Sequence, residues 1–505
     1  MSRLLALTTG LVLFAAEEDA AKRKKAREIF DQAAEMVGAA TPQFQTAALL
    51  HLADNYTQFD KKRSLELFRQ AFEAASTLSG QASDLQAEVI RLLAEVNVSE
   101  AIALLPQMAE SKDIGLGMDF DPRQRAVNAL IKKLLETKEF DRAALLLDTA
   151  GGAFSYRGLQ SILEALPEHD PRLESLFSAG MTAFSAKPDR VFVELLAALA
   201  KKLPEPTVHQ AAKAAVSWIV SREDKESHSA QISTPKGSVS FDSRKGVELF
   251  NVMHLLSAAD PKRAEELLQS RPALRAALER FPEGMHSMTG DKDNDSLSFN
   301  FSSSSGEMDP QERAKRAVAA LSESRKQAAL QVLEKDAQKA LDLVASIPLA
   351  GDQAEVLGAA AASVGEKDVP KARLVLNQTA KLLKDVEEPA GSLPAWLNVA
   401  RAAHRIHDQQ RAWDALDHAV TAVLELHKRD TDKEKGNHAA SEYWPSTQRG
   451  RQIVATAAKL FGVDGEPVCS KFTDQDLALL MRIEFAQILL GREGTEGRTM
   501  VMSGN

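Results

Sequence analysis

The sequence predicts an all-α protein, a right-handed α-solenoid of helical hairpin repeats with two polar insertions. A helical pattern recurs along most of the chain at intervals of roughly 40 residues, the length of a two-helix repeat. The chain has 505 residues, too many for one compact core, and a repeat array suits such a length because each unit packs on its neighbours. Aromatic residues make up only 5%, and small alanines recur where helices would cross closely.

The clearest helix of the pattern is Asp60–Ala75. Asp60 is a residue type that caps helix starts, and apolar residues such as Phe68 and Phe72 follow at helical spacing. The preceding stretch, Ala47–Phe59, shows the same periodicity. The two stretches therefore predict one helical hairpin.

Copies of the second helix share a small residue, a large apolar residue four positions later and another small residue three positions after that. Close copies begin at Ala26, Ser64, Ala143 and Ala412, and looser copies at Ala101, Ala264, Ala340 and Ala372. An aspartate precedes several of them as a predicted N-cap, at Asp60, Asp260, Asp336, Asp368 and Asp408.

A family resemblance follows from the first hairpin. Its characteristic positions are Leu49, Leu52, Ala53 and Tyr56 on the first helix, and Ser64, Phe68 and Ala71 on the second. This pattern resembles the tetratricopeptide repeat, closely over residues 26–75, with a turn one residue shorter than is usual for that family. The rest of the chain resembles the wider class of α-solenoids that includes HEAT-type repeats. The resemblance implies an interaction scaffold for a protein or peptide, and it carries over no catalytic residue.

Residues 1–16 predict a signal peptide. Arg3 provides a short cationic start, and an apolar run follows that is too short to span a membrane. The protein is therefore expected in the periplasm or outside the cell. The alternatives are a buried first helix of the array, an uncleaved anchor, and a cytoplasmic location.

The remaining organisation is predicted from the helical pattern and from changes in composition. The two polar insertions both contain a Ser-apolar-Ser-Phe unit, at Ser238–Phe241 and Ser296–Phe299, which leaves a small strand pairing as the alternative to disordered loops. The expected segments are N-terminal helical repeats at 17–220, a polar insertion at 221–246, a helical hairpin at 247–281, a disordered Ser/Asp-rich insertion at 282–310, C-terminal helical repeats at 311–430, a loop at 431–446, capping helices at 447–490 and a flexible tail at 491–505.

The composition and motifs argue against several functions. The single cysteine, Cys469, excludes an intramolecular disulfide and a zinc site built on several thiolates of this chain. The net charge of −9 argues against general nucleic-acid binding. The sequence contains no phosphate-binding GxxxxGK[ST], no dinucleotide glycine motif and no GxSxG. A non-enzymatic protein without a cofactor is therefore expected.

Two possible metal sites are also judged unfavourable. Asp291, Asp293 and Asp295 have the spacing of a calcium loop, but Ser302 stands where the bidentate glutamate would be. Five of the eleven histidines cluster in the C-terminal part of the chain without an HExxH motif, namely His404, His407, His418, His427 and His438. We therefore expect no bound metal.

The candidate binding residues are aromatic. Trp396 and Trp413 fall on the two helices of one predicted hairpin, and Tyr443 and Trp444 follow a little further on. Aromatic side chains on a solenoid surface anchor peptides, although packing between paired helices is the more frequent explanation of such residues. Two further functional hypotheses remain open. One is an enzyme with its site at the irregular middle and the insertions, and the other is a cytoplasmic regulatory repeat protein.

Overall fold

The structure is a computed structural model. It describes residues 2–78, 82–110, 121–148, 154–222, 230–234, 236–289, 298–301, 310–384, 386, 388–433 and 445–492. The chain divides into two units. Unit 1 comprises Met1–Val89 and Met308–Asn505, and unit 2 comprises Ile90–Glu307. In both units the described residues are mainly helical, which confirms the predicted all-α class.

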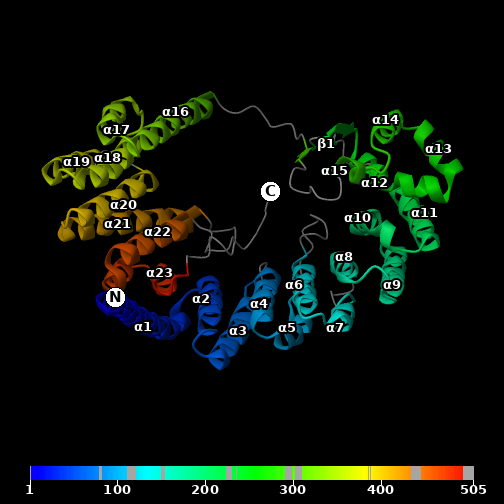
Figure 1. The fold of residues 1–505 in the computed structure, drawn as a ribbon, viewed down its shortest axis with the longest axis horizontal. Coiled ribbons are helices and arrows are strands. Elements are labelled where there is room, and N and C mark those ends of the chain that lie inside the picture. Colours follow the sequence, from blue (N-terminus) through cyan, green and yellow to red (C-terminus); the bar gives the residue numbers. More distant parts are fainter. Residues whose placement is uncertain are drawn as a thin grey trace. The chain divides into compact units, whose positions relative to one another are not determined.

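Unit 1 is formed by helices from both ends of the chain (Figure 1). Its N-terminal helices are α1 (Ser2–Met36), α2 (Pro42–Tyr56), α3 (Lys61–Ser76) and α4 (Ala82–Val96), whose last turns belong to unit 2. Its C-terminal helices are α16 (Pro310–Leu333), α17 (Ala337–Leu343), α18 (Ala350–Gly365), α19 (Val369–Leu383), α20 (Pro389–Arg405), α21 (Gln409–Lys433), α22 (Pro445–Phe461) and α23 (Gln475–Leu489). A 3-10 segment, Gly462–Lys471, joins the last two.

Successive helices of unit 1 pack as hairpins. Helix α2 packs on α3, α18 on α19 and α20 on α21. In the C-terminal part of unit 1, α16 also packs on α18, α18 on α20 and α20 on α22. At the crossing of α2 and α3, the hydroxyl of the fully buried Ser64 donates to the carbonyl of Ala53 at 2.7 Å. Phe68 and Ala71 are fully buried beside it. The small and large positions of the sequence pattern are thus both in the core.

The predicted aspartate caps are confirmed. The Asp60 carboxylate accepts a hydrogen bond from the backbone amide of Arg63 at 3.0 Å, which satisfies one free amide at the start of α3. Equivalent bonds to the amide three residues ahead are made by Asp260, Asp336, Asp368 and Asp408.

N-terminal and C-terminal helices pack together inside unit 1. Helix α23 packs against both α1 and α2. Asp476 accepts hydrogen bonds from the amide and hydroxyl of Thr41 at 2.9 and 2.7 Å. Arg492 lies 3.1 Å from the Asp54 carboxylate. We expected these last helices to cap an open end, but α23 lies between α22 and the N-terminal helices α1 and α2. Helix α23 is buried on more than one face, and the sequence pattern did not reveal its second apolar face.

Helix α1 continues without a break from Ser2 to Met36, so the predicted signal peptide and the first repeat copy share one helix. Ile29 and Phe30 of that copy are fully buried. Among the described helices, none combines the length and apolar character that crossing a bilayer requires.

Unit 2 contains shorter helices and a small sheet. The helices are α5 (Val98–Leu104), α6 (Pro122–Glu136), α7 (Phe140–Leu145), α8 (Tyr156–Ala165), α9 (Arg172–Ala186), α10 (Arg190–Leu199), α11 (Glu205–Ser221), α12 (Arg244–Ala259), α13 (Pro261–Gln269), α14 (Pro272–Arg280) and α15 (Met285–Thr289). The strands are β1 (Ala230–Thr234), β2 (Gly237–Phe241) and β3 (Ser298–Phe301).

The sheet joins the two polar insertions. Strand β1 lies in the centre and pairs antiparallel with β2 and β3, so that Ile232 stands opposite both Val239 and Phe299. The unit Ser238–Phe241 lies in β2, and the described part of Ser296–Phe299, which is Ser298 and Phe299, lies in β3 on the other side of β1. Within the segment expected to be disordered, the structure describes α15 and β3 instead, because alternating residues in a polar segment still form a strand when a neighbouring strand satisfies their backbone.

Candidate functional site

The predicted aromatic residues contact different neighbours. Trp396 of α20 stacks on the exposed His418 of α21, with ring centroids 4.3 Å apart. Trp413 of α21 stacks on Phe461 at the end of α22, with centroids 4.6 Å apart. Both indoles thus take part in contacts between helices, and their role in binding stays a prediction. Tyr443 and Trp444 lie outside the described residues.

The clustered histidines have separate surroundings. His404 meets the ring of Phe461 edge-on, with centroids 5.1 Å apart, whereas His427 is buried and shares a hydrogen bond with Ser446 at 3.1 Å. Within the described ranges, no group of three or more histidine, cysteine or acidic side chains is placed to hold a metal ion. The aspartates of the possible calcium loop, residues 291–295, fall outside those ranges.

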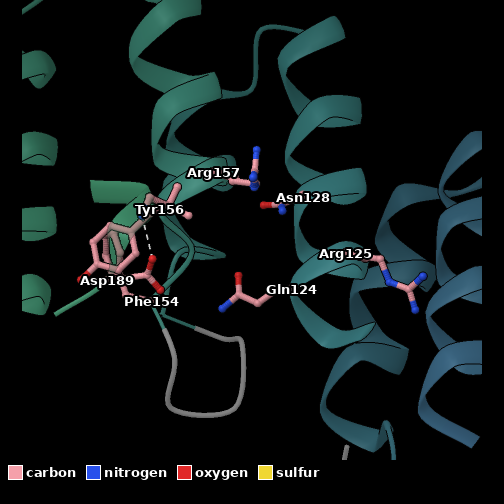
Figure 2. Close-up of a pocket in the computed structure, with 8 residues that line it drawn as sticks. Gln124, Arg125, Asn128, Phe154, Tyr156, Arg157 and Asp189 are labelled. Carbon is pink, nitrogen blue, oxygen red and sulfur yellow. Dashed lines mark hydrogen bonds between the residues drawn. The ribbon is translucent and has the colours of Figure 1, made fainter. Parts of the chain in front are cut away.

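A small pocket in unit 2 offers a better-defined site. It lies between α6, α8 and the start of α10 and is open to solvent (Figure 2). Its lining combines amide, guanidinium, aromatic and carboxylate side chains. The lining residues are Gln124, Arg125, Asn128, Phe154, Tyr156, Arg157, Asp189 and Val191.

Three helix starts form this pocket. Asp121 caps α6 by accepting from the amide of Arg123 at 2.9 Å, and Asp189 caps α10 by accepting from the amide of Val191 at 2.7 Å. Ser155 caps α8 in the same way. Each cap satisfies an amide of the first turn, and the three starts together direct positive helix ends toward one region.

Helices α6 and α8 pack closely beside the pocket. A Cβ atom at Gly158 would lie 2.4 Å from Cδ1 of Ile131, so a larger residue there would displace the Ile131 side chain. This packing places the Ser155 hydroxyl 2.8 Å from Oδ1 of Asn128, to which it donates. This contact fixes the Asn128 amide at the pocket.

The polar lining suits the recognition of a peptide group or a carboxylate. Figure 2 shows Gln124, Asn128 and Arg157 around the space between α6 and α8, with Arg125 on the other side of α6. The Gln124 side chain is buried and Arg157 is exposed. Amides both donate and accept hydrogen bonds, as a peptide backbone requires, and a guanidinium donates two parallel bonds to a carboxylate.

An aromatic wall faces this polar lining. Tyr156 is buried, and its ring centroid lies 5.1 Å from that of the half-buried Phe154. The Tyr156 hydroxyl donates to the carbonyl of Lys187 at 3.5 Å. Burial, reinforced by the negative charge of Asp189, raises the pKa of the Tyr156 phenol above its usual value of about 10. A phenol is protonated at neutral pH even without this shift.

In comparisons with known proteins, no family model and no curated protein matches this chain. The site therefore rests on its own geometry.

No residue of this pocket is among the binding residues predicted from the sequence. Residues 151–158 interrupt the repeat pattern, which in sequence indicates a break between helices and not a site. The sequence feature that could have indicated the pocket is a set of three capping residues, Asp121, Ser155 and Asp189, each directly before a helix. Capping residues occur at most helix starts, so the signal does not show that three starts converge.

Proposed function

We propose that this protein is a non-enzymatic α-solenoid scaffold that binds an extended segment of a protein or peptide in the pocket between α6 and α8. The observation that carries the proposal is the lining itself. Gln124, Asn128 and Arg157 supply the hydrogen-bonding groups that a peptide backbone or carboxylate needs, next to the apolar surface of Phe154.

The chemistry of the lining favours binding over catalysis. Asp189 is the one acid of the pocket, and its carboxylate already accepts from the amide of Val191 as the cap of α10. The phenol of Tyr156 is held in its neutral form. An activated nucleophile needs a neighbouring base that removes its proton, and the hydroxyl of Tyr156 donates instead to the backbone carbonyl of Lys187.

We also propose that the chain is built from repeats similar to tetratricopeptide and HEAT-type repeats. The hairpin packing of α2 on α3 and the buried small residue Ser64 support this. The proposal also includes export to the periplasm or the exterior, which rests on residues 1–16. Sequencing the N-terminus of protein purified from its host tests export, because a start at Met1 or Ser2 contradicts removal of a signal peptide.

Selection of a random peptide library on the full-length protein tests binding. The selected peptides are expected to bind the Arg157→Gln and Gln124→Ala variants about tenfold more weakly, since hydrogen bonds to charged and buried groups are lost. Arg275→Gln is the matched control, because Arg275 lies in the same unit on α14 and pairs with Glu265 at 2.5 Å. Equal binding by the Arg157 and Arg275 variants would contradict the proposed site.

A further inference from the structure

A continuous row of polar side chains crosses three successive first helices of unit 1. From α18 to α20, the Asn398 amide donates to the carbonyl of Glu355 at 3.1 Å. Along α20, Arg401 donates to Oδ1 of Asn398 at 2.9 Å, and it reaches α22 by donating to the hydroxyl of Thr456 at 3.1 Å. On α22, Arg449 donates to Oε1 of Gln452 at 3.2 Å. We call Asn398, Arg401, Arg449, Gln452 and Thr456 the basic row.

The two arginines of the basic row differ from their neighbours in charge pairing. Within the described residues, neither Arg401 nor Arg449 has a carboxylate partner, and both donate only to neutral oxygens. By contrast, Arg405, one turn further along α20, pairs with Glu366 at 2.9 Å, and Arg451 of α22 lies 3.5 Å from Glu484. Two guanidinium charges on one face are thus left without a counter-ion.

The surroundings of Arg401 strengthen the attraction of its guanidinium for an anion. Its side chain is exposed at the surface, yet the atoms packed around the guanidinium remove enough water to lower its pKa below the usual value. A partly desolvated cation interacts more strongly with an arriving anion than a fully hydrated one, because less water screens the pair.

We propose that the basic row is a second binding site, which takes an acidic segment of a protein partner through paired carboxylates. Arg401 and Arg449 each present a planar fork of donors that matches a carboxylate. Thr456, which Arg401 contacts, is about two helical turns or 10 Å from Arg449 along α22. About three residues of an extended peptide cover that distance, so acidic residues spaced in this way would reach both arginines.

Charged residues of α16 and α18 make one end of the basic row unfavourable for an acidic ligand. The buried Lys326 of α16 is surrounded by three carboxylates, from Glu323 at 2.7 Å and from Asp352 and Glu355 at 3.1 Å. This cluster leaves an excess of negative charge near the α18 end of the row. An acidic segment is therefore repelled from that end and is directed along α20 and α22.

Fluorescence anisotropy with a labelled oligoglutamate peptide and the full-length protein tests the inference. Oligoglutamate is expected to bind, whereas oligoglutamine and oligolysine peptides of equal length are not. The Arg401→Gln and Arg449→Gln variants should each weaken binding about tenfold, since each loses a charge-assisted pair. Arg405→Gln is the matched control and should change binding less than about twofold, because the charge of Arg405 is already neutralised by Glu366.

Three outcomes would overturn the inference: no binding of oligoglutamate, equal losses in the Arg401 and Arg405 variants, or tighter binding of single-stranded DNA than of oligoglutamate. Arg401→Lys is a second variant that keeps the charge and should retain binding within a few-fold, which separates loss of charge from loss of folding. The site lies in unit 1 and the pocket lies in unit 2. The Arg157→Gln variant should therefore leave oligoglutamate binding unchanged, and the two proposals can fail independently.

Discussion

Unit 1 and unit 2 are both built from packed helices, but their helix starts and crossings differ. In unit 1, hairpins such as α2–α3 repeat a fixed order of small and large residues, and the C-terminal first helices α16, α18, α20 and α22 pack on one another in succession. In unit 2, three helices that begin at different capping residues converge on a pocket, and two insertions meet in one sheet. Regular packing thus produces a row of polar contacts across several helices, and irregular packing produces a concave site.

The largest test compares one buried ring from each unit. Phe68 of α3 and Phe192 of α10 are both fully buried, and Phe192 also stacks on Phe184 with centroids 4.5 Å apart. Each change to alanine is expected to cost about 3–5 kcal/mol, from lost burial and the cavity left behind. Hydrogen exchange should show lost protection in α3 for Phe68→Ala and in α10 for Phe192→Ala. Loss of protection throughout both units in either variant would show that they unfold together.

In unit 1, the C-terminal helix α23 packs on the N-terminal helix α2, a contact between helices far apart in sequence. Replacing Asp476 with alanine removes both hydrogen bonds to Thr41 and is expected to cost about 1–3 kcal/mol, because the amide and hydroxyl lose a charged partner. Hydrogen exchange at the start of α2 is the measurement, with Asp464→Ala as an exposed control. Equal exchange in the two variants would mean that the contact does not hold α2 to α23.

A pH dependence is expected at the same junction. His427 is buried against Phe44, and burial lowers its pKa below the usual value of about 6.5, although Asp474, Asp430 and Asp476 oppose the shift. The folded state therefore binds the proton less readily than the unfolded state, so stability falls as pH decreases below that value. The loss is at most about 1.4 kcal/mol per pH unit.

Thermal unfolding followed between pH 7.5 and pH 5.5 measures this loss. The His427→Gln variant cannot take up the proton, and it should lose less stability over that range than the unchanged protein. Parallel curves for the two proteins would assign the pH dependence to other groups.

The smallest expected effect compares two helix caps. Asp60 caps α3 at an exposed position, whereas Asp189 caps α10 and is buried. Each change to alanine is expected to cost about 1 kcal/mol, with the larger loss at Asp189 because its partner amide is left without water. Chemical denaturation measures both. A larger loss at Asp60 would indicate that the regular hairpins depend more on local signals than the irregular helices do.

Features that depend on residues close together in sequence were predicted correctly, and features that depend on distant residues were not. The aspartate caps and the hairpin formed by Ala47–Phe59 and Asp60–Ala75 depend on neighbours a few residues apart, and the structure agrees with them. The strand pairing of β1 with β3 and the pocket beside Gly158 depend on residues far apart in sequence. Local patterns carry no information about which distant segments meet, so these features were left open or missed.

The sequence by itself determined the helical class, the caps and the buried stripe of each repeat, because helix periodicity and capping are local properties of the chain. Only the tertiary structure decided that α23 packs on α1 and α2, that three helix starts share one pocket, and that Arg401 reaches Thr456 on a neighbouring helix. These outcomes depend on which surfaces bury each other most completely, and that choice is made among all helices of a unit at once.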